Sequence, residues 1–255
     1  MSGRALLPRG LDDGQEVPPM DSFVLPRYDL PRAGRAIATL LRNPDDLPQV
    51  FTLIDALSGT APQRLLRRLR GTETGRRMLR DRPDVTTVLG DRERLRVMPA
   101  GSLGRAYLSF VESEGISADG IKDASKGRVD VSGSRDMAFL HQRMRDTHDL
   151  WHAATGYKGD VIGELSLLAF TLAQHWNTAI GFLIAAAILK GFGRADLQSI
   201  RDGYRRGKEA KWLPAVEWEQ LLELPVEQVR VRLGLRAPPV YTPLRTSELR
   251  AMGML

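Results

Sequence analysis

The chain has 255 residues, of which 42% are apolar, which excludes a disordered or fibrous protein and allows one large domain with a buried core. It contains no cysteine, which excludes disulfides and thiolate metal sites, so any metal must be bound by His, Asp or Glu. The formal net charge of +6 favours anionic partners such as membrane headgroups, nucleic acid or acidic proteins.

Residues 1–30 are rich in Pro and Gly and are predicted to form an irregular N-terminal arm. Asp12, Asp13 and Glu16 interrupt this arm, so a signal or transit peptide is not expected. The longest apolar run, 179–189, has about eleven residues, whereas a bilayer requires roughly twenty. No membrane-spanning helix is therefore expected.

Helical periodicity dominates the first half of the chain after the arm. It predicts helices over 30–42, 47–57, 73–82 and 102–114, and a further one that begins after Thr60 with Pro62 in its first turn. Two short β-branched runs, 86–89 and 95–97, are weak strand candidates. The polar, Gly-rich residues 116–133 are predicted to form a long loop.

In the second half, Ser134 is expected to cap a long helix that ends at Thr155, with Gly156 as its C′ residue. Asp160 is expected to cap the next helix, which is predicted to run to about Lys190. Helices over 195–210, 214–224 and 226–233 follow. The prediction is an all-α protein with a single multi-helix domain, residues 31–241, and a C-terminal tail, residues 242–255.

In the most basic segment of the chain, arginines recur among leucines, as on a basic amphipathic helix. Its members are Arg64, Arg67, Arg68, Arg70, Arg76, Arg77 and Arg80. Such a run is also typical of a solvated helix face, and it could contact either an anionic lipid or a partner protein.

Two histidines four residues apart, His148 and His152, are the main candidates for metal ligands. On a helix such residues lie on one face about one turn apart, a spacing that suits two ligands of one divalent metal. If the helices that end at Gly156 and begin at Asp160 form an antiparallel hairpin, Glu164 should lie level with His152. A polar helix face without metal is the simpler interpretation of the same spacing.

Asp149 is rotated by about 100° from His148, so it can bind the metal from the flank or orient an imidazole from behind. Two histidines with one or two carboxylates leave coordination positions open, as in reactive metal sites. Burial of these groups would cost several kcal/mol unless they are paired or bind a metal.

The apolar stretch 181–189 follows the candidate ligands and is small and apolar on every side. It could form part of a slot for a hydrocarbon chain, with Leu168, Phe182 and Ile184 as lipid-binding residues. An ordinary central core helix is the alternative interpretation.

The segment His148-Asp149-x-x-His152, followed by eleven residues and Glu164, resembles the HDxxH-x11-E signature of the Coq-four family of ubiquinone (coenzyme Q) biosynthesis proteins. Further similar segments occur in the family's order within residues 35–241: Pro99–Tyr107, His148–Gly156, Gly163–Glu164, Trp218–Glu219 and Arg232–Tyr241. Several separated motifs in the right order make the resemblance specific.

The resemblance implies an all-helical protein, peripherally attached to a membrane, that acts in coenzyme Q synthesis. It implies metal-binding and catalytic roles for His148, Asp149, His152 and Glu164, with zinc or iron(II) as the metal ion. The implied reaction is a metal-dependent oxidative decarboxylation of a polyprenylated hydroxybenzoate, with hydroxylation of the same ring carbon, C1.

The partners that the resemblance implies are a polyprenylated benzoquinone precursor, the membrane surface, other ubiquinone biosynthesis proteins and a second copy of the chain in a homodimer. Since no targeting peptide is expected, the predicted location is cytoplasmic, on the inner face of the membrane of a bacterial-type cell.

Three other functions are compatible with parts of the sequence to different degrees. A non-catalytic lipid- or quinone-binding scaffold, which organises the biosynthetic complex, is the main alternative. A phosphohydrolase of the HD type would need a suitable upstream His, and His141 lies in the same predicted helix as His148. Nucleic-acid binding has only the basic charge in its favour and is not expected.

Overall fold

The computed structural model describes residues 28–40, 42, 46–116, 134–189, 191 and 197–251. No strand forms among these residues, and Ser102 and Pro225 make an isolated bridge, so the predicted all-α class is confirmed. The α-helices are α1 (Leu30–Leu40), α2 (Leu47–Leu57), α3 (Ala61–Arg70), α4 (Glu73–Asp81), α5 (Thr86–Leu89), α6 (Arg92–Val97), α7 (Leu103–Ser113), α9 (Arg135–Asp146), α10 (His148–Thr155), α11 (Val161–His175), α12 (Thr178–Leu189), α13 (Leu197–Glu209), α14 (Val226–Leu233) and α15 (Thr246–Ala251).

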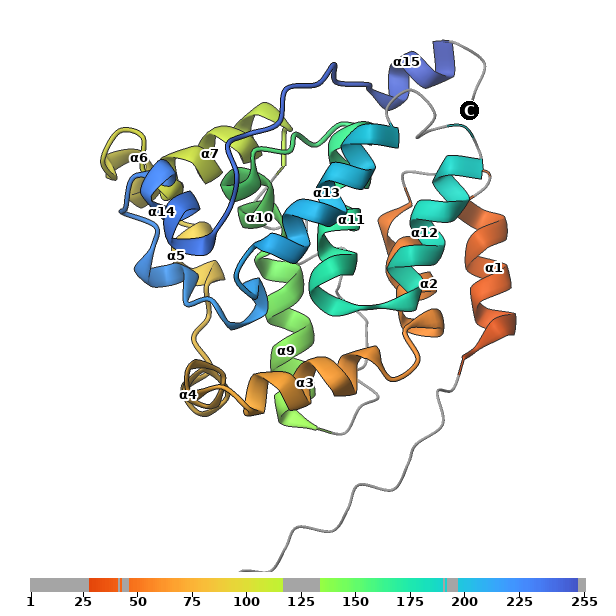
Figure 1. Cartoon of the computed structure of the whole chain (residues 1–255), viewed down its shortest axis with the longest axis horizontal. Helices are drawn as coiled ribbons and strands as arrows, with labels where there is room; N and C mark the ends of the chain where they lie inside the picture. Colours follow the sequence, from red (N-terminus) through yellow and green to blue (C-terminus); the bar gives the residue numbers. More distant parts are fainter. Residues whose placement is uncertain are drawn as a thin grey trace, which may run out of the picture.

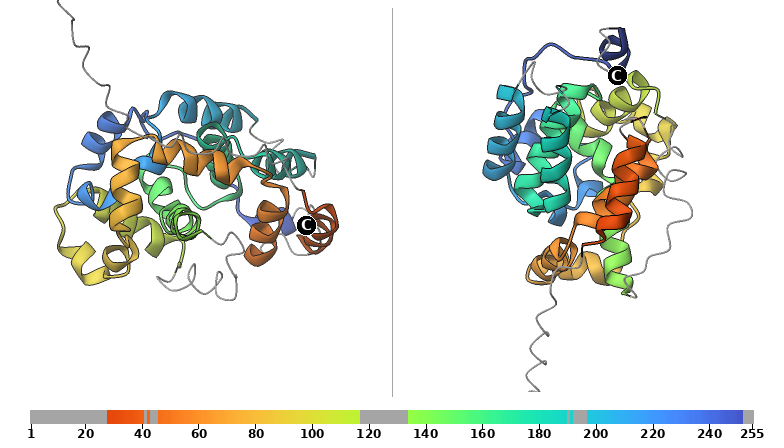
Figure 2. Two further views of the ribbon diagram at one scale, coloured as in Figure 1. Left: turned by 90° about the horizontal axis from the view of Figure 1, so that it is seen from below. Right: turned by 90° about the vertical axis from the view of Figure 1, so that its right-hand side faces the viewer.

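Helices α11 and α13 lie side by side in the middle of the molecule (Figure 1). On one side α12 packs against α11 and α2, and α2 packs against α1. Helix α1 lies at the right-hand edge of Figure 1 and faces the viewer in the right-hand view of Figure 2. On the other side α10 packs against α7 and α14. Helix α3 crosses the bottom of this arrangement, next to α9 (Figure 1).

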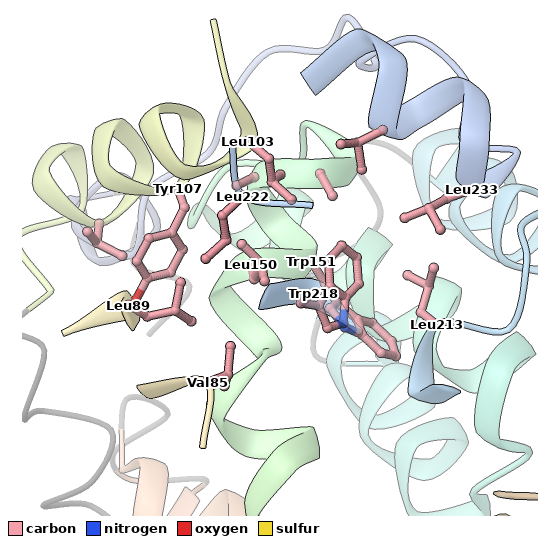
Figure 3. Close-up of a cluster of buried hydrophobic side chains, with 14 of the residues drawn as sticks. Val85, Leu89, Leu103, Tyr107, Leu150, Trp151, Leu213, Trp218, Leu222 and Leu233 are labelled. Atoms are coloured by element: carbon pink, nitrogen blue, oxygen red, sulfur yellow. The ribbon is translucent and has the colours of Figure 1, made fainter. Parts of the chain in front are cut away.

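The largest apolar cluster surrounds α10. Its residues Leu150 and Trp151 are 0% and 3% exposed, and they contact a cluster that includes Tyr107 of α7 and the buried Trp218 and Leu222 (Figure 3). Because α10 is buried on this side, its rotation is fixed, and so is the direction in which His148 and His152 point.

The crossing of α11 and α13 depends on two glycines. A Cβ at Gly203 would lie 2.3 Å from the Ser166 carbonyl oxygen, and a Cβ at Gly207 would lie 2.4 Å from that of Phe170. Only glycine allows the two backbones to approach this closely. The crossing fixes the position of α11, the helix that carries Glu164.

Several predicted helices are confirmed, but the one expected from Asp160 to Lys190 is wrong, because two helices are present. Trp176 adopts left-handed backbone angles with φ of 51° and ends α11. The Asn177 side chain then accepts a hydrogen bond of 2.9 Å from Ala179 N, which caps the start of α12. Asn177 lies in a short polar stretch, 174–178, between two apolar runs, and it is a helix-start signal that the sequence analysis missed.

Both strand candidates are also wrong, since 86–89 forms α5 and 95–97 lies in α6. Asp84 accepts a hydrogen bond from Thr86 N and Asp91 accepts one from Arg94 N, so local carboxylates nucleate short helices there. The helix predicted over 214–224 is replaced by two 3₁₀ turns, Leu213–Ala215 and Trp218–Gln220.

The predicted long helix 134–155 is divided into α9 and α10 at Thr147, and Gly156 ends α10 with φ of 84°, as expected. Most of the N-terminal arm, most of the loop 116–133 and the start of the helix 195–210 lie outside the described residues. The domain limits 31–241 stay a prediction. No helix within the described ranges combines the length and apolarity that crossing a bilayer requires.

Candidate metal site

The candidate metal site lies where the start of α11 meets α10. His148, His152 and Glu164 each offer a ligand atom, and these atoms lie within 4.8 Å of one another. Glu164 Oε1 is 3.2 Å from His152 Nε2, and its Oε2 is 3.9 Å from His148 Nε2. Glu164 therefore faces both imidazoles, as the sequence predicted, although α10 packs mainly on α7 and α11 mainly on α13 rather than as one central hairpin.

Both imidazoles are oriented through their other ring nitrogen. His152 Nδ1 donates to the carbonyl oxygen of Tyr157 at 3.1 Å, and His148 Nδ1 donates to Asp149 Oδ1 at 3.2 Å. A carbonyl oxygen can only accept, so the Nδ1 atom of His152 carries a proton. Asp149 thus contacts His148 from behind and is not in the group of three ligands, the second of its two predicted roles.

This arrangement directs the Nε2 atoms of both histidines toward the carboxylate of Glu164. When Nδ1 of a neutral histidine carries the proton, Nε2 presents a lone pair. His152 Nε2 is buried and has no hydrogen-bond partner, although Glu164 Oε1 is only 3.2 Å away. A lone pair and a carboxylate repel each other unless a proton or a metal cation lies between them. The residues therefore fit a divalent metal held by two imidazoles and one carboxylate.

One side of the site is closed and the other is open. His152 is 1% exposed, and Phe110 of α7 stacks on its ring with a centroid distance of 4.7 Å and an interplanar angle of 12°. The side chains of His148 and Glu164 are 41% and 43% exposed. A metal held there would remain accessible to a small molecule, as in reactive rather than structural sites.

The charges of the site shift two pKa values. Burial would raise the pKa of Glu164, but the neighbouring His152 and His148 outweigh it and lower this pKa to about 2. Burial would lower the pKa of His148, but the hydrogen bond to Asp149 and the charge of Glu164 outweigh it and raise this pKa to about 8. Glu164 is thus ionised at neutral pH, whereas His148 must lose a proton before it can bind a metal.

Metal affinity is accordingly expected to depend on pH. Below pH 8 a metal must displace the proton of His148, so the apparent affinity should fall by about tenfold for each pH unit between 8 and 6. Above pH 8 this dependence should level off. Titrations with Co²⁺ across this range would measure it, and an affinity that does not change between pH 6 and 8 would show that His148 is not a ligand.

The three predicted lipid-binding residues do not line one surface. Ile184 is 8% exposed and packs in a cluster with Leu165, Ala169 and others, with Leu168 against its edge. Phe182 is 42% exposed and lies on the outer face of α12. Helix α12 is therefore not a central core helix. Leu168, Phe182 and Ile184 also do not together form one slot for a hydrocarbon chain.

The arginines of the basic run contact several different partners. Arg70, Arg77 and Arg80 form ion pairs with Asp136, Glu217 and Asp81. Arg68 lies over the Trp212 ring at 4.3 Å, and Arg64 donates to the carbonyl oxygen of Trp176 at 2.8 Å. Much of the run thus contacts other segments of the chain rather than only solvent.

Sequence reasoning missed Phe110, Tyr157 and Tyr241 as neighbours of the site. Phe110 stacks on His152, the Tyr157 carbonyl oxygen accepts a hydrogen bond from it, and the Tyr241 hydroxyl accepts one from Lys158 N, contacts that helical spacing does not reveal. His141 and His175 lie outside the ligand group. His175 packs against Trp151 with a ring distance of 5.5 Å.

Comparisons with known proteins agree with the sequence motifs. Residues 30–239 match the family described as coenzyme Q (ubiquinone) biosynthesis protein Coq4. The mitochondrial ubiquinone biosynthesis protein COQ4 of Arthroderma otae is 36% identical over 223 residues, which cover 83% of this chain and 79% of the relative. That of Talaromyces stipitatus is 35% identical over 220 residues, which cover 83% and 73%.

Among solved structures, a candidate ubiquinone biosynthesis protein of Nostoc punctiforme PCC 73102 has a similar fold. Its TM-score is 0.61 at 24% identity, and the match covers 82% of this chain and 100% of that one. The relatives from the two fungi are described as mitochondrial, so they give no support to the predicted bacterial-type location.

Proposed function

The chain belongs to the Coq4 family of coenzyme Q (ubiquinone) biosynthesis proteins, and from this premise we propose that it catalyses a metal-dependent step on a prenylated ring precursor. The proposed reaction is the oxidative decarboxylation of a polyprenylated hydroxybenzoate, in which a hydroxyl replaces the carboxyl group at C1. The single observation that carries the proposal is that the Nε2 atoms of His148 and His152 both face the carboxylate of Glu164 on the open side of the site.

The replacement is a two-electron oxidation of the ring carbon. With dioxygen as oxidant and a two-electron donor, R–CO₂H, O₂, two electrons and two protons give R–OH, CO₂ and water. His148, His152 and Glu164 would hold the metal, which when bound supplies a Lewis acid for the phenolic or carboxylate oxygen and, as iron(II) rather than zinc, redox chemistry.

The protein's own residues would hold the ligands and protect them. The Tyr157 carbonyl and Asp149 keep the protons of His152 and His148 on Nδ1, so that both Nε2 atoms remain available. Phe110 covers one face of His152 and excludes water there. The exposed side of His148 and Glu164 is where the ring carboxylate would approach.

An assay for product formation tests this proposal against the alternative of a non-catalytic scaffold. The exposed apolar side chains of α12 would also suit a scaffold that binds lipid. The protein loaded with iron(II) would be incubated with a prenylated 4-hydroxybenzoate, dioxygen and a reductant. Release of CO₂ with formation of the C1-hydroxylated product, lost on removal of the metal, is expected. Binding of the precursor without any product would instead favour a lipid-binding scaffold that organises other ubiquinone biosynthesis proteins or a second copy of the chain.

Attachment to a membrane surface is supported by apolar side chains around α12. Trp176, Phe182 and Leu189 are 63%, 42% and 81% exposed, and Arg64 binds the Trp176 carbonyl beside them. Trp and Arg together are typical of the interface between lipid and water. Trp176 also keeps a positive φ of 51°, a strained conformation for a bulky residue that suggests a functional reason.

The change Trp176→Asn is therefore expected to have opposite effects on membrane binding and on stability. Binding to vesicles that contain phosphatidylglycerol should weaken about tenfold, because the apolar ring is lost. The thermal midpoint should stay the same or rise, because Asn tolerates positive φ. Vesicle co-sedimentation would measure the first effect, with Val97→Asn as a control at another exposed apolar residue. Unchanged co-sedimentation would exclude this surface from membrane contact.

A further inference from the structure

The segment after α14 crosses the connection between the two ligand-bearing helices. We call residues 236–245 the C-terminal strap; it runs from α14 past α10 toward α15 (Figure 1). A Cβ at Gly156, where α10 ends, would lie 2.6 Å from Pro238 Cβ. At the other end of the strap, Arg245 pairs with Glu114, which also accepts a hydrogen bond from Gly159 N at 3.3 Å.

Tyr241, the half-buried tyrosine of the strap, holds the peptide group that orients His152. The carbonyl oxygen of Tyr157 accepts the hydrogen bond from His152 Nδ1 at 3.1 Å. The N–H of the same peptide group, which belongs to Lys158, donates to the Tyr241 hydroxyl at 2.9 Å. One peptide plane is thus fixed on both sides, by a metal-ligand candidate and by the strap.

The same hydroxyl also holds the first turn of α11. It donates to Asp160 Oδ2 at 2.8 Å. Asp160 Oδ1 accepts hydrogen bonds from Ile162 N at 3.0 Å, from Gly163 N at 3.3 Å and from Leu244 N at 3.0 Å. Glu164 follows directly in this turn, and its N–H bonds to the Asp160 carbonyl oxygen at 2.8 Å. The position of Glu164 therefore depends on a cap that Tyr241 completes.

The close packing at Gly163 leaves the hydroxyl little freedom. A Cβ at Gly163 would lie 2.5 Å from the Tyr241 hydroxyl and 2.0 Å from the Lys158 carbonyl oxygen. The glycine that precedes the acid in the sequence motif is thus required by the approach of the strap and the connection. Burial and the bond to Asp160 also raise the pKa of Tyr241, so it stays protonated and remains a donor.

We propose that Tyr241 is a positioning residue for the metal site, because its one hydroxyl joins the peptide that orients His152 to the cap that places Glu164. The inference rests on the metal site proposed above. It assigns the C-terminal strap a role in the geometry of ligands that lie far from it in the sequence.

The test compares Tyr241→Phe, which removes only the hydroxyl, with Tyr204→Phe, the same change on α13 at a tyrosine outside the connection. Binding of Co²⁺ would be followed by its visible absorption. Tyr241→Phe is expected to weaken binding by at least about tenfold, as for residues that support metal ligands, and to alter the absorption bands, which report coordination geometry. Tyr204→Phe should leave both unchanged.

Further variants separate the effect of the Tyr241 hydroxyl from the effect of packing by its ring. Tyr241→Ala should weaken Co²⁺ binding no less than Tyr241→Phe; if only Tyr241→Ala weakens it, the ring packs but the hydroxyl does not position the ligands, and the inference is overturned. Asp160→Asn keeps an oxygen for the helix cap but changes the acceptor of the hydroxyl, and should weaken binding in the same direction even if Tyr241→Phe fails to fold.

The outcomes distinguish this inference from the proposed function. If the wild-type chain binds no Co²⁺, the metal site itself is refuted. If the wild type binds Co²⁺ and Tyr241→Phe binds it equally well with the same spectrum, the metal site stands and the role of Tyr241 is refuted.

Discussion

Replacement of Glu164 by glutamine is expected to lower the affinity for a divalent metal by at least about 100-fold and to abolish product formation. Removal of a supporting partner costs about 10- to 100-fold in affinity, so loss of a ligand should cost more. Among the residues that the structure describes, Glu164 is the carboxylate that faces both Nε2 atoms, and its charge would compensate that of the cation.

The variant Glu164→Gln should remain folded. The new amide can donate a hydrogen bond to the lone pair of His152 Nε2, which has no hydrogen-bond partner in the wild type. The metal-free variant is nevertheless expected to be less stable than the metal-free wild type, because the ionised Glu164, whose pKa the two histidines lower, stabilises the folded wild type. Glu223→Gln provides the matched control, because Glu223 is exposed and lies outside the ligand group.

Calorimetric titration with Zn²⁺ and a turnover assay would be run on the same samples. A variant that keeps wild-type metal affinity would remove Glu164 from the ligand set. A variant that loses the metal but retains full activity would show that the metal is not catalytic, and would contradict the proposed mechanism.

The second large effect is expected at the crossing of α11 and α13. Gly203→Ala should lower the free energy of unfolding by about 2 kcal/mol, because a methyl group would have to fit 2.3 Å from the Ser166 carbonyl oxygen. Backbone atoms cannot move aside as a flexible side chain can, so the helices must separate.

Gly34→Ala is the matched control for this effect. Gly34 also lies within a helix, α1, but a Cβ there would meet nothing within 4 Å. This control is expected to gain roughly 0.5–1 kcal/mol from the higher helix propensity of alanine. Urea unfolding would measure both, and equal shifts for the two variants would contradict the close crossing.

Separation of α11 from α13 should also affect the metal site. Since α11 carries Glu164 in its first turn, Gly203→Ala is expected to weaken metal binding as well as to lower the stability of the fold. Gly34→Ala should weaken neither metal binding nor stability. Metal affinity is thus expected to depend on the close approach of α11 and α13 in the core.

The placement of Glu164 opposite His148 and His152 was predictable from the sequence because it depends on short-range regularities. Helical periodicity places His148 and His152 on one face, and Gly156 and Asp160 mark the end of one helix and the start of the next. These local signals, with the short connection between them, suffice to bring Glu164 opposite the histidines.

The remaining features depend on long-range contacts. Whether Asp149 binds a metal or orients His148 follows from the rotation of α10, which its burial against α7 and Trp218 determines. The role of Tyr241 follows from a strap that returns from the end of the chain. Helical spacing does not reveal either contact. The break at Trp176 was missed because the polar stretch 174–178 is short and lies between two long apolar runs.

Metal content tests the central claim most directly. Protein purified without a histidine tag would be analysed by elemental mass spectrometry for the wild type and for His152→Ala side by side. The predicted result is about one divalent metal ion per wild-type chain, lost in the variant. Absence of metal from both proteins, even after reconstitution with zinc or iron(II), would contradict the metal site and leave His148, His152 and Glu164 as a polar contact between two helices.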